Sequence, residues 1–325
     1  MTPATFAARL RSVLSRSAPL VGVEIGPDHV TAVTVAQNRG ATVLSAYATE
    51  PLPAQAVTPA VNGKNVQDPP AAVEALKRVL DGLPRRPTRV ALVVPDNVAK
   101  VSLVRFEQVP ARARDLDELI RWQVRKASPF RIEDAQISYT PGVATPKGGR
   151  EFIVALMRHD IVEEYEQLCT GAGAHAGIVD LASFNLINAV VAGSSDVAAG
   201  ADWLLVNVTA DYSTIAIVRG EHLIFFRNRP AEGDGNLADL VHQTTMYYED
   251  RLNGSGFGRV ILAGLASHPS MKGDPGSVQR DLEERLGTRV ESIDPRPAAA
   301  LMDRIDVTPD LLDRLAAPVG LLLRG

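Results

Sequence analysis

Hydrophobic and polar positions along the chain switch between a period of two and a period near 3.6 residues, which predicts alternating strands and helices. The first strands are expected at 20–25, 29–36 and 42–48. Further along, the pattern predicts helices at 71–80, 113–127, 160–172 and 183–191, interleaved with extended segments at 89–94, 100–109, 151–157 and 176–180. Such alternation is typical of an α/β fold.

The opening pattern returns after a linker at 193–200 that is rich in Gly, Ser and Ala. Aligning Val23 with Val206, an offset of 183, brings a second set of three expected strands into register with the first. A helix at 237–252, a strand at 259–263, a helix at 278–286 and a Pro-rich tail ending at 318–320 follow. Two similar halves predict a duplicated architecture with lobes at 21–192 and 201–325. A chance similarity of two three-stranded meanders is the alternative.

The composition indicates an ordinary globular chain of about two domains, with 325 residues, 46% hydrophobic and 22% charged. A formal net charge of -4 argues against a nucleic-acid partner, because phosphate backbones require basic surfaces. The single cysteine, Cys169, cannot form an internal disulfide, and the six histidines lack metal-ligand spacing. No apolar run reaches the roughly 18 residues that a membrane-spanning helix needs, so we expect a cytoplasmic protein. Because of the histidine spacing, we expect no metal site.

Residues 1–20 have the pattern of a short amphipathic helix, because Phe6, Leu10 and Leu14 share one face and arginines lie nearby. A basic amphipathic helix can lie in an anionic membrane surface. A loosely docked or frayed terminus is the simpler interpretation, since one helix this short binds weakly alone.

Two hairpins facing each other across a cleft would form a nucleotide site, where glycine turns bind phosphates through backbone N–H groups and a carboxylate positions Mg²⁺. The first hairpin carries Glu24 and Gly26, which suit that role. The second carries Asn207 and Thr209, which lack the charge for Mg²⁺ and the small size for a phosphate turn. A single Gly264 after the strand at 259–263 could contact an adenosine. These five residues would line a nucleotide cleft in which several of the groups needed to bind phosphate and Mg²⁺ are replaced.

The chain resembles the PilM family, which comprises actin-like (FtsA-like) cytoplasmic proteins of type IV pilus assembly. Its opening segment Val21–Gly26 is similar to the family's phosphate loop, with Glu24 where the family normally has Asp. The stretch Asp117–Trp122, followed by Pro129 and Phe130, is similar to the family's most recognisable helix, and 319–325 resembles its C-terminal signature. The motifs also occur in the family's order.

This resemblance implies an actin-like ATPase fold: two RNase H-like lobes, with a small α+β subdomain inserted in the first lobe at about 97–176. The segment at about 300–325 is expected to pack back on the first lobe. The family binds ATP, but Asn207, Thr209 and Leu265 depart from its pattern, so neither ATP nor magnesium is carried over as a required cofactor.

The resemblance also implies a partner. Family members bind the N-terminal tail of PilN, an inner-membrane protein, in a groove beside the inserted subdomain, and so connect it to the cytoplasmic pilus motor. A protein of this kind acts at the cytoplasmic face of the inner membrane and contacts the membrane only peripherally.

A tail that becomes ordered on binding needs apolar pockets, and the helix at 113–127 with its exit is the expected wall. Trp122 lies off the apolar stripe of that helix, and a partly exposed Trp is a common interface anchor. The expected contacts are apolar or basic: Leu119, Trp122, Arg121, Arg125 and Phe130. The alternatives are that Trp122 packs inside the subdomain, that the arginines belong to a solvated helix face, and that Phe130 is buried.

The leading hypothesis is therefore a scaffold of type IV pilus or related secretion machinery, a pseudo-ATPase without catalytic residues. A catalytically active actin-like ATPase or kinase is the alternative, and the residues at 207, 209 and 264 argue against it. A cytoplasmic domain of type II secretion is a third possibility.

Overall fold

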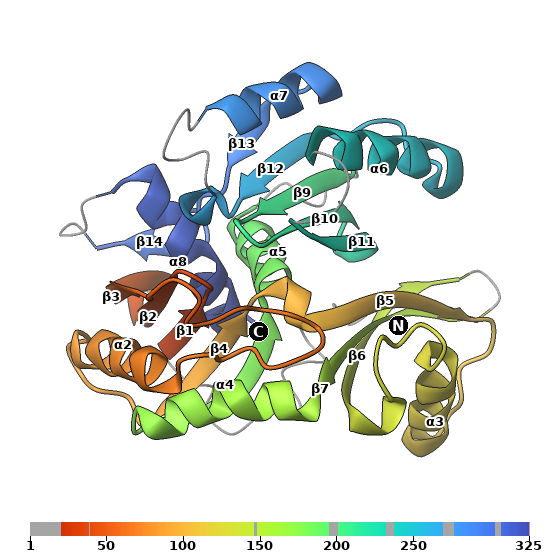
Figure 1. Ribbon diagram of the computed structural model, residues 1–325. Helices are drawn as coiled ribbons and strands as arrows, with labels where there is room; N and C mark the ends of the chain where they lie inside the picture. The colour runs from red at the N-terminus through yellow and green to blue at the C-terminus, as the bar shows by residue number, and fades with distance from the viewer. Residues whose placement is uncertain are drawn as a thin grey trace.

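Two stacked α/β lobes and a smaller sheet at the side of the first lobe make up the structure, a computed structural model (Figure 1). It describes residues 21–38, 40–145, 148–194, 201–231, 237–268, 276–302 and 307–324. The predicted amphipathic segment at 1–20 and residues 195–200 of the predicted linker lie outside the described residues.

The sheets of the two lobes repeat one topology. The first has the order β14-β3-β2-β1-β4-β8 and the second the order β11-β10-β9-β12-β13. In each, three antiparallel strands are followed by two parallel ones. The strands of the first sheet are β1 (Val21–Ile25), β2 (His29–Asn38), β3 (Ala41–Pro51), β4 (Arg89–Val94), β8 (His175–Leu181) and β14 (Ala300–Leu301). Those of the second are β9 (Trp203–Val208), β10 (Tyr212–Arg219), β11 (His222–Pro230), β12 (Arg259–Ala263) and β13 (Val290–Ser292).

The strand register confirms the predicted duplication. Val23 pairs with Ala32 in the first meander, and Val206 pairs with Ile215 in the second. Both partners are therefore displaced by the predicted offset of 183 residues. This strand order is that of an RNase H-like lobe, so the expected fold of two such lobes is correct.

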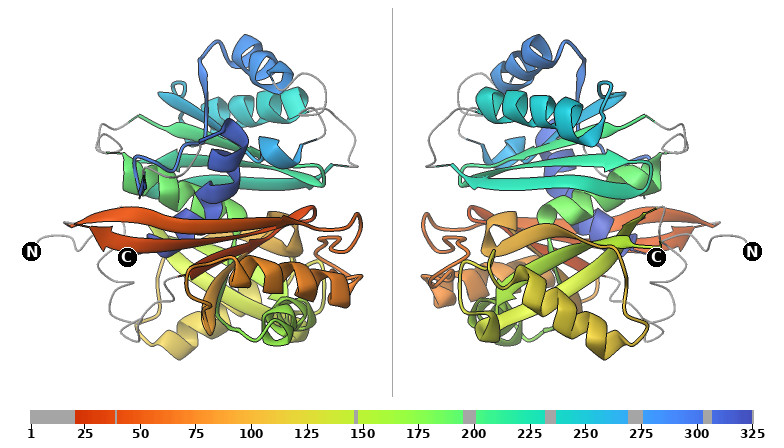
Figure 2. Two further views of the ribbon diagram at one scale, coloured as in Figure 1. Left: turned by 90° about the vertical axis from the view of Figure 1, so that its left-hand side faces the viewer. Right: turned by 90° about the vertical axis from the view of Figure 1, so that its right-hand side faces the viewer.

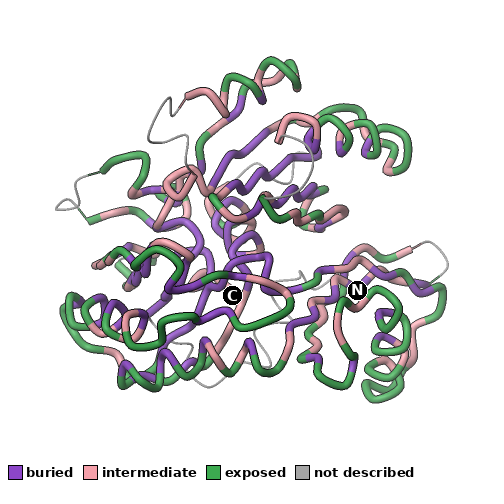
Figure 3. Tube along the Cα trace, viewed as in Figure 1, coloured by how far each residue is buried: buried purple, intermediate pink, exposed green. Residues whose placement is uncertain are grey.

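Helices form three layers that cover and separate the two sheets (Figure 2). Buried residues of the middle helices and of both sheets, among them Leu186, Ala316, Val93 and Leu205, share one core. Figure 3 shows that burial is concentrated in the strands and the middle helices, whereas the outer helices expose one side. From the first lobe outward to the second, the helices are α2 (Pro69–Asp81) and α4 (His159–Gly171), then α5 (Ala182–Gly193) and α8 (Pro309–Leu322), then α6 (Leu237–Leu252) and α7 (Ser277–Leu286).

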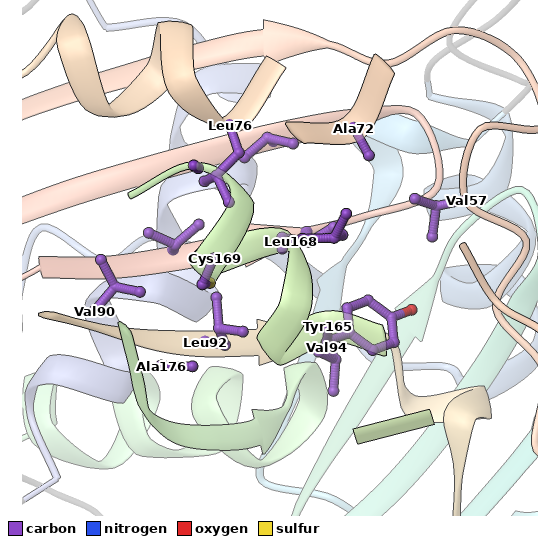
Figure 4. Close-up of a cluster of buried hydrophobic side chains, with 14 of the residues drawn as sticks. Val57, Ala72, Leu76, Val90, Leu92, Val94, Tyr165, Leu168, Cys169 and Ala176 are labelled. Atoms are coloured by element: carbon purple, nitrogen blue, oxygen red, sulfur yellow. The ribbon is translucent and has the colours of Figure 1, made fainter. Parts of the chain in front are cut away.

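The inserted subdomain has its own sheet and core. β5 (Ala99–Phe106), β7 (Arg150–Arg158) and β6 (Ala135–Ala144) form an antiparallel sheet, and α3 (Ala113–Val124) covers one face of it. The predicted boundary at 176 differs from the structure, because α4 packs in the core of the first lobe. Figure 4 shows Tyr165 and Cys169 of α4 near β4. The subdomain therefore ends near Arg158.

The C-terminal segment is a helix rather than the predicted Pro-rich tail. Thr308 caps α8 by accepting a hydrogen bond from the backbone N–H of Leu311, and Pro309 occupies the first turn, where a missing N–H costs nothing. Leu315 and Val319 then pack against Val33 and Leu44 of the first lobe. The chain from β14 onward thus belongs to the first lobe, on which it was expected to pack.

We predict that Gly320→Ala destabilises the fold. A Cβ at Gly320 would lie 1.8 Å from the carbonyl oxygen of Asn185, because α5 and α8 are in backbone contact there. Overpacking of this kind costs roughly 1–3 kcal/mol or more, which outweighs the approximately 1 kcal/mol that Ala gains over Gly in a helix. Urea unfolding measures the difference. The control is Gly142→Ala, whose Cβ would come no closer than 3.4 Å to the nearest atom, the Glu151 carbonyl oxygen. Equal midpoints for the two variants would contradict this account of the contact.

Candidate functional site

The turns of the two meanders face each other across a small cavity between the lobes. Its lining includes all five residues predicted for the cleft: Glu24, Gly26, Asn207, Thr209 and Gly264. The cavity is about 40 Å³ in volume. A water molecule needs roughly 10–15 Å³ by the same measure, so a cavity of this volume has room for a few waters.

A buried carboxylate, Asp96, lies at the base of this cleft, in the short 3-10 turn η1 (Asp96–Val98) that follows β4. It accepts hydrogen bonds from the backbone N–H of Ser183 at 2.9 Å and from the Ser183 hydroxyl. Two further donors come from the second lobe: the Thr214 hydroxyl at 2.7 Å and the Asn207 amide at 3.3 Å. Burial raises the pKa of Asp96, although these hydrogen bonds oppose that effect.

The sequence analysis missed Asp96, because the expected extended segment ends at residue 94 and no hydrophobic pattern marks the turn after it. A polar pair, Asp96 and Asn97, directly after the apolar strand β4 is the signal that could have found it. In α/β sheets, functional side chains gather outside the carboxyl ends of parallel strands.

Asn207 has a structural role in this arrangement. The sequence analysis noted only that its neutral amide lacks the charge to bind Mg²⁺. Its register position is equivalent to that of Glu24, since Glu24 pairs with Thr31 and Asn207 pairs with Thr214. The amide is buried and donates to Asp96, so an acidic residue there would place a second negative charge against the first. Asn207 thus suits a junction between the lobes.

The turns predicted to bind phosphate use their backbone donors internally. In the second hairpin, the Thr209 hydroxyl accepts from the N–H groups of Asp211 at 3.3 Å and Tyr212 at 3.2 Å. In the first, the Gly26 N–H donates to the carbonyl of His29 at 2.9 Å. Gly264 has a left-handed conformation with φ of 82°, and its N–H donates to the Asp313 carboxylate at 2.8 Å. In all three turns, the chain itself therefore already provides acceptors for these backbone N–H groups.

Acidic groups dominate the cleft. Burial, reinforced by the negative charges of Asp313, Asp28 and Asp96, raises the pKa of Glu24 to about 8. Glu24 is therefore mostly protonated at neutral pH and offers little charge to Mg²⁺. Across the described ranges, no group of three His, Cys, Asp or Glu side chains is arranged to hold a metal ion.

The predicted partner-binding residues lie on α3 and its exit, at the end of the inserted subdomain away from the second lobe (Figure 1). Trp122 is 68% exposed, so it does not pack inside the subdomain. Leu119 and Phe130 are half-buried against the subdomain core. Arg121 donates to the carbonyl of Ile132 at 2.9 Å, and Arg125 contacts Glu133 at 2.8 Å. The arginines thus fix the exit loop to the helix, while Trp122 points into solvent.

Comparisons with known proteins agree with this architecture. The sequence model of the family described as type IV pilus assembly protein PilM matches residues 22–251. Among solved structures, a chain of the PilM-PilN type IV pilus biogenesis complex superposes with a TM-score of 0.77 at 18% identity, over 94% of this chain and 98% of that chain. That similarity shows the same fold.

Two more distant structures are also similar. A Bacteroides thetaiotaomicron protein of actin-like ATPase fold and unknown function has a TM-score of 0.47 at 11% identity, covering 86% of this chain and 91% of its own. The cytoplasmic domain of EpsL, an inner-membrane component of the Vibrio cholerae type II secretion system, has a TM-score of 0.46 at 9% identity, covering 76% and 82%. No helix in the part of the chain that the structure describes is both long and apolar enough to span a membrane.

We predict that Glu24→Gln flattens the pH dependence of stability. Because the folded protein binds the Glu24 proton more tightly than the unfolded chain, the free energy of unfolding falls as the pH rises from the ordinary Glu range to about 8. Gln cannot ionise, so the variant should be more stable than the parent at about pH 8, by on the order of 1 kcal/mol or more. Urea unfolding between about pH 5 and 8 measures this.

The exposed Glu107→Gln serves as the control, and it should follow the parent at every pH. Parallel curves for the parent and Glu24→Gln would contradict the assigned burial of this carboxyl group.

Proposed function

The chain belongs to the PilM family of type IV pilus assembly proteins, and we propose that it acts there as a non-catalytic scaffold that binds a PilN-like membrane partner. The matched residues, 22–251, include both meanders and the whole inserted subdomain. The PilM chain of similar fold is part of a complex with PilN, which supports a partner of the same type for this protein. The proposed location is the cytoplasmic face of the inner membrane, where the partner's N-terminal tail would reach it.

The observation that carries this proposal is the exposure of Trp122. A Trp side chain that is 68% exposed leaves a large apolar area in water, and buried Trp residues are frequent energetic centres of interfaces. Its helix is held rigidly, since Arg121 and Arg125 fix the exit loop and Asp117 accepts a hydrogen bond from Tyr139 at 2.5 Å. A rigid apolar anchor binds a flexible tail with less entropic cost than a mobile one.

The residues beside Trp122 suit a short peptide. Leu119 and Phe130 remain half-buried, so a bound tail could cover their accessible parts together with the indole ring. Arg121 and Arg125 are engaged with the chain's own loop, and we assign them to shaping the surface rather than to pairing with charges on the tail.

The interior of the cleft supports a role without turnover. Asp96 is the carboxylate best placed to act as a general base, but it already accepts four hydrogen bonds and is fully buried. A base has to be within reach of the proton that it removes, and Asp96 is enclosed by its donors. Glu24 is mostly neutral at physiological pH. We therefore propose that no nucleotide or metal is required for the scaffold role.

We predict that Trp122→Ala weakens binding of the partner tail by tenfold or more, since losing a buried Trp anchor typically costs about 2 kcal/mol or more. The measurement is a calorimetric titration of the folded protein with a synthetic peptide of the N-terminal tail of a PilN-like protein from the same organism. The neighbouring exposed Gln123→Ala should bind like the parent. Absence of binding by the parent would refute the scaffold proposal, and unchanged binding by Trp122→Ala would refute the assigned surface.

We further predict that the purified protein releases no phosphate from Mg-ATP above the rate without protein. A sensitive phosphate-release assay over hours measures this, with the heat-denatured protein as the blank. The competing ATPase or kinase hypothesis predicts Mg²⁺-dependent release that Glu24→Ala abolishes. That result would replace the non-catalytic assignment.

A further inference from the structure

We propose that the chain supplies its own ligand for the cleft: Asp28, Asp313 and Arg314 of the first lobe form an internal latch that holds the two lobes closed without a nucleotide. The latch closes on the segment from Gly264 to Ser267 of the second lobe. It concerns a different part of the molecule from the tail-binding surface on α3.

The latch residues are fixed to the first lobe. Asp28 lies in the turn between β1 and β2. Asp313 and Arg314 lie on α8, whose residue Leu315 is fully buried with Val33 and Leu44, while Ala316 and Ala317 lie in the core that both sheets share. The opposing segment follows β12 and forms the short turn η4 (Leu265–Ser267), which belongs to the second lobe. Every contact between these two groups therefore joins the lobes directly.

The Asp313 carboxylate occupies the backbone donors of the second lobe. Its Oδ1 accepts from the Gly264 N–H at 2.8 Å and its Oδ2 accepts from the Ala266 N–H at 2.7 Å. Two adjacent backbone N–H groups in a glycine turn after a strand are an arrangement that binds anions such as phosphate. Here a carboxylate of the chain itself takes that place.

Arg314 and Asp28 complete the connection. Arg314 Nη2 donates to the Ala266 carbonyl at 3.0 Å and lies 3.4 Å from Asp28 Oδ2. The Ser267 hydroxyl donates to Asp28 Oδ1 at 2.9 Å. Although burial opposes it, the hydrogen bond from His29 and the charge of Arg314 hold the pKa of Asp28 below its usual range, so Asp28 keeps its negative charge.

The same groups leave little for a nucleotide to bind. A phosphate entering the cleft would meet the negative charge of Asp28 and would have to displace Asp313 from its two N–H donors. Among the described residues that line the cleft, two isolated buried polar atoms have no hydrogen-bond partner: His29 Nε2 and Arg314 Nη1. The cavity of about 40 Å³ has room for waters that could bind them.

A ligand that contacts both lobes of a two-lobed protein favours the closed arrangement, and a tethered one does so at high effective concentration. The latch is a tethered ligand of this kind. It keeps the lobes, and with them the inserted subdomain, in one relative position whether or not nucleotide is present.

The test is a distance measurement between spin labels on the two lobes. Glu74→Cys on α2 and Glu284→Cys on α7 are exposed sites, and the native Cys169 is fully buried. We expect one narrow distance distribution for the labelled parent, unchanged by millimolar Mg-ATP. In the variant Asp28→Ser/Asp313→Asn the distribution should broaden and move to longer distances. The matched control, Asp310→Asn, removes an exposed carboxylate on the same helix and should behave like the parent.

A parent distribution that is broad, or that shifts on adding Mg-ATP, would overturn the latch, as would an unchanged distribution in the double variant. If the double variant does not fold, Ser267→Ala removes a single contact and should broaden the distribution to a smaller extent. Since Trp122 is untouched throughout, the tail titration reports separately on the scaffold proposal.

Discussion

A buried carboxylate that must be satisfied from two lobes at once is the constraint on which this structure depends. A buried carboxyl group without hydrogen-bond donors is costly in a protein interior, so the donors of Asp96 have to be present and correctly placed. They come from α5 and from two strands of the second lobe. The relative position of the lobes beside the cleft is thus tied to a polar network formed by the chain's own residues.

The duplicated positions show how one architecture has been adapted differently in its two halves. Glu24 and Asn207 have the same register in their meanders, yet Glu24 faces the cavity and Asn207 donates to Asp96. The neutral amide at 207 is therefore complementary to the carboxyl group of Asp96 across the junction between the lobes. A cleft built in this way joins the lobes.

The sequence predicts those parts of the fold whose periodicity is local. The two meanders and their offset follow from alternation within each strand, and the expected equivalence of Val23 and Val206 holds to the residue. Trp122 could be predicted as an exposed residue because it lies off the apolar stripe of its own helix.

Features that depend on distant neighbours could not be predicted in the same way. The prolines at 309 and 318 masked α8, although Thr308 as a cap and the spacing of Leu312, Leu315 and Val319 support a helix. The boundary of the inserted subdomain depends on which core the apolar face of α4 joins. The latch and the Asp96 network join residues far apart in the chain, and no local sequence pattern predicts such contacts.

The return of the C-terminus to the first lobe has a consequence for how the protein is made. Val33 and Leu44 are translated long before Leu315 and Val319, the side chains that cover them. The strand β14, which extends the first sheet beside β3, also arrives only after the whole second lobe. The first lobe therefore exposes this apolar surface until the second lobe has been synthesised. During that period the long-range contacts form slowly, and association with other chains competes with folding. This delay between synthesis and burial follows directly from the chain topology.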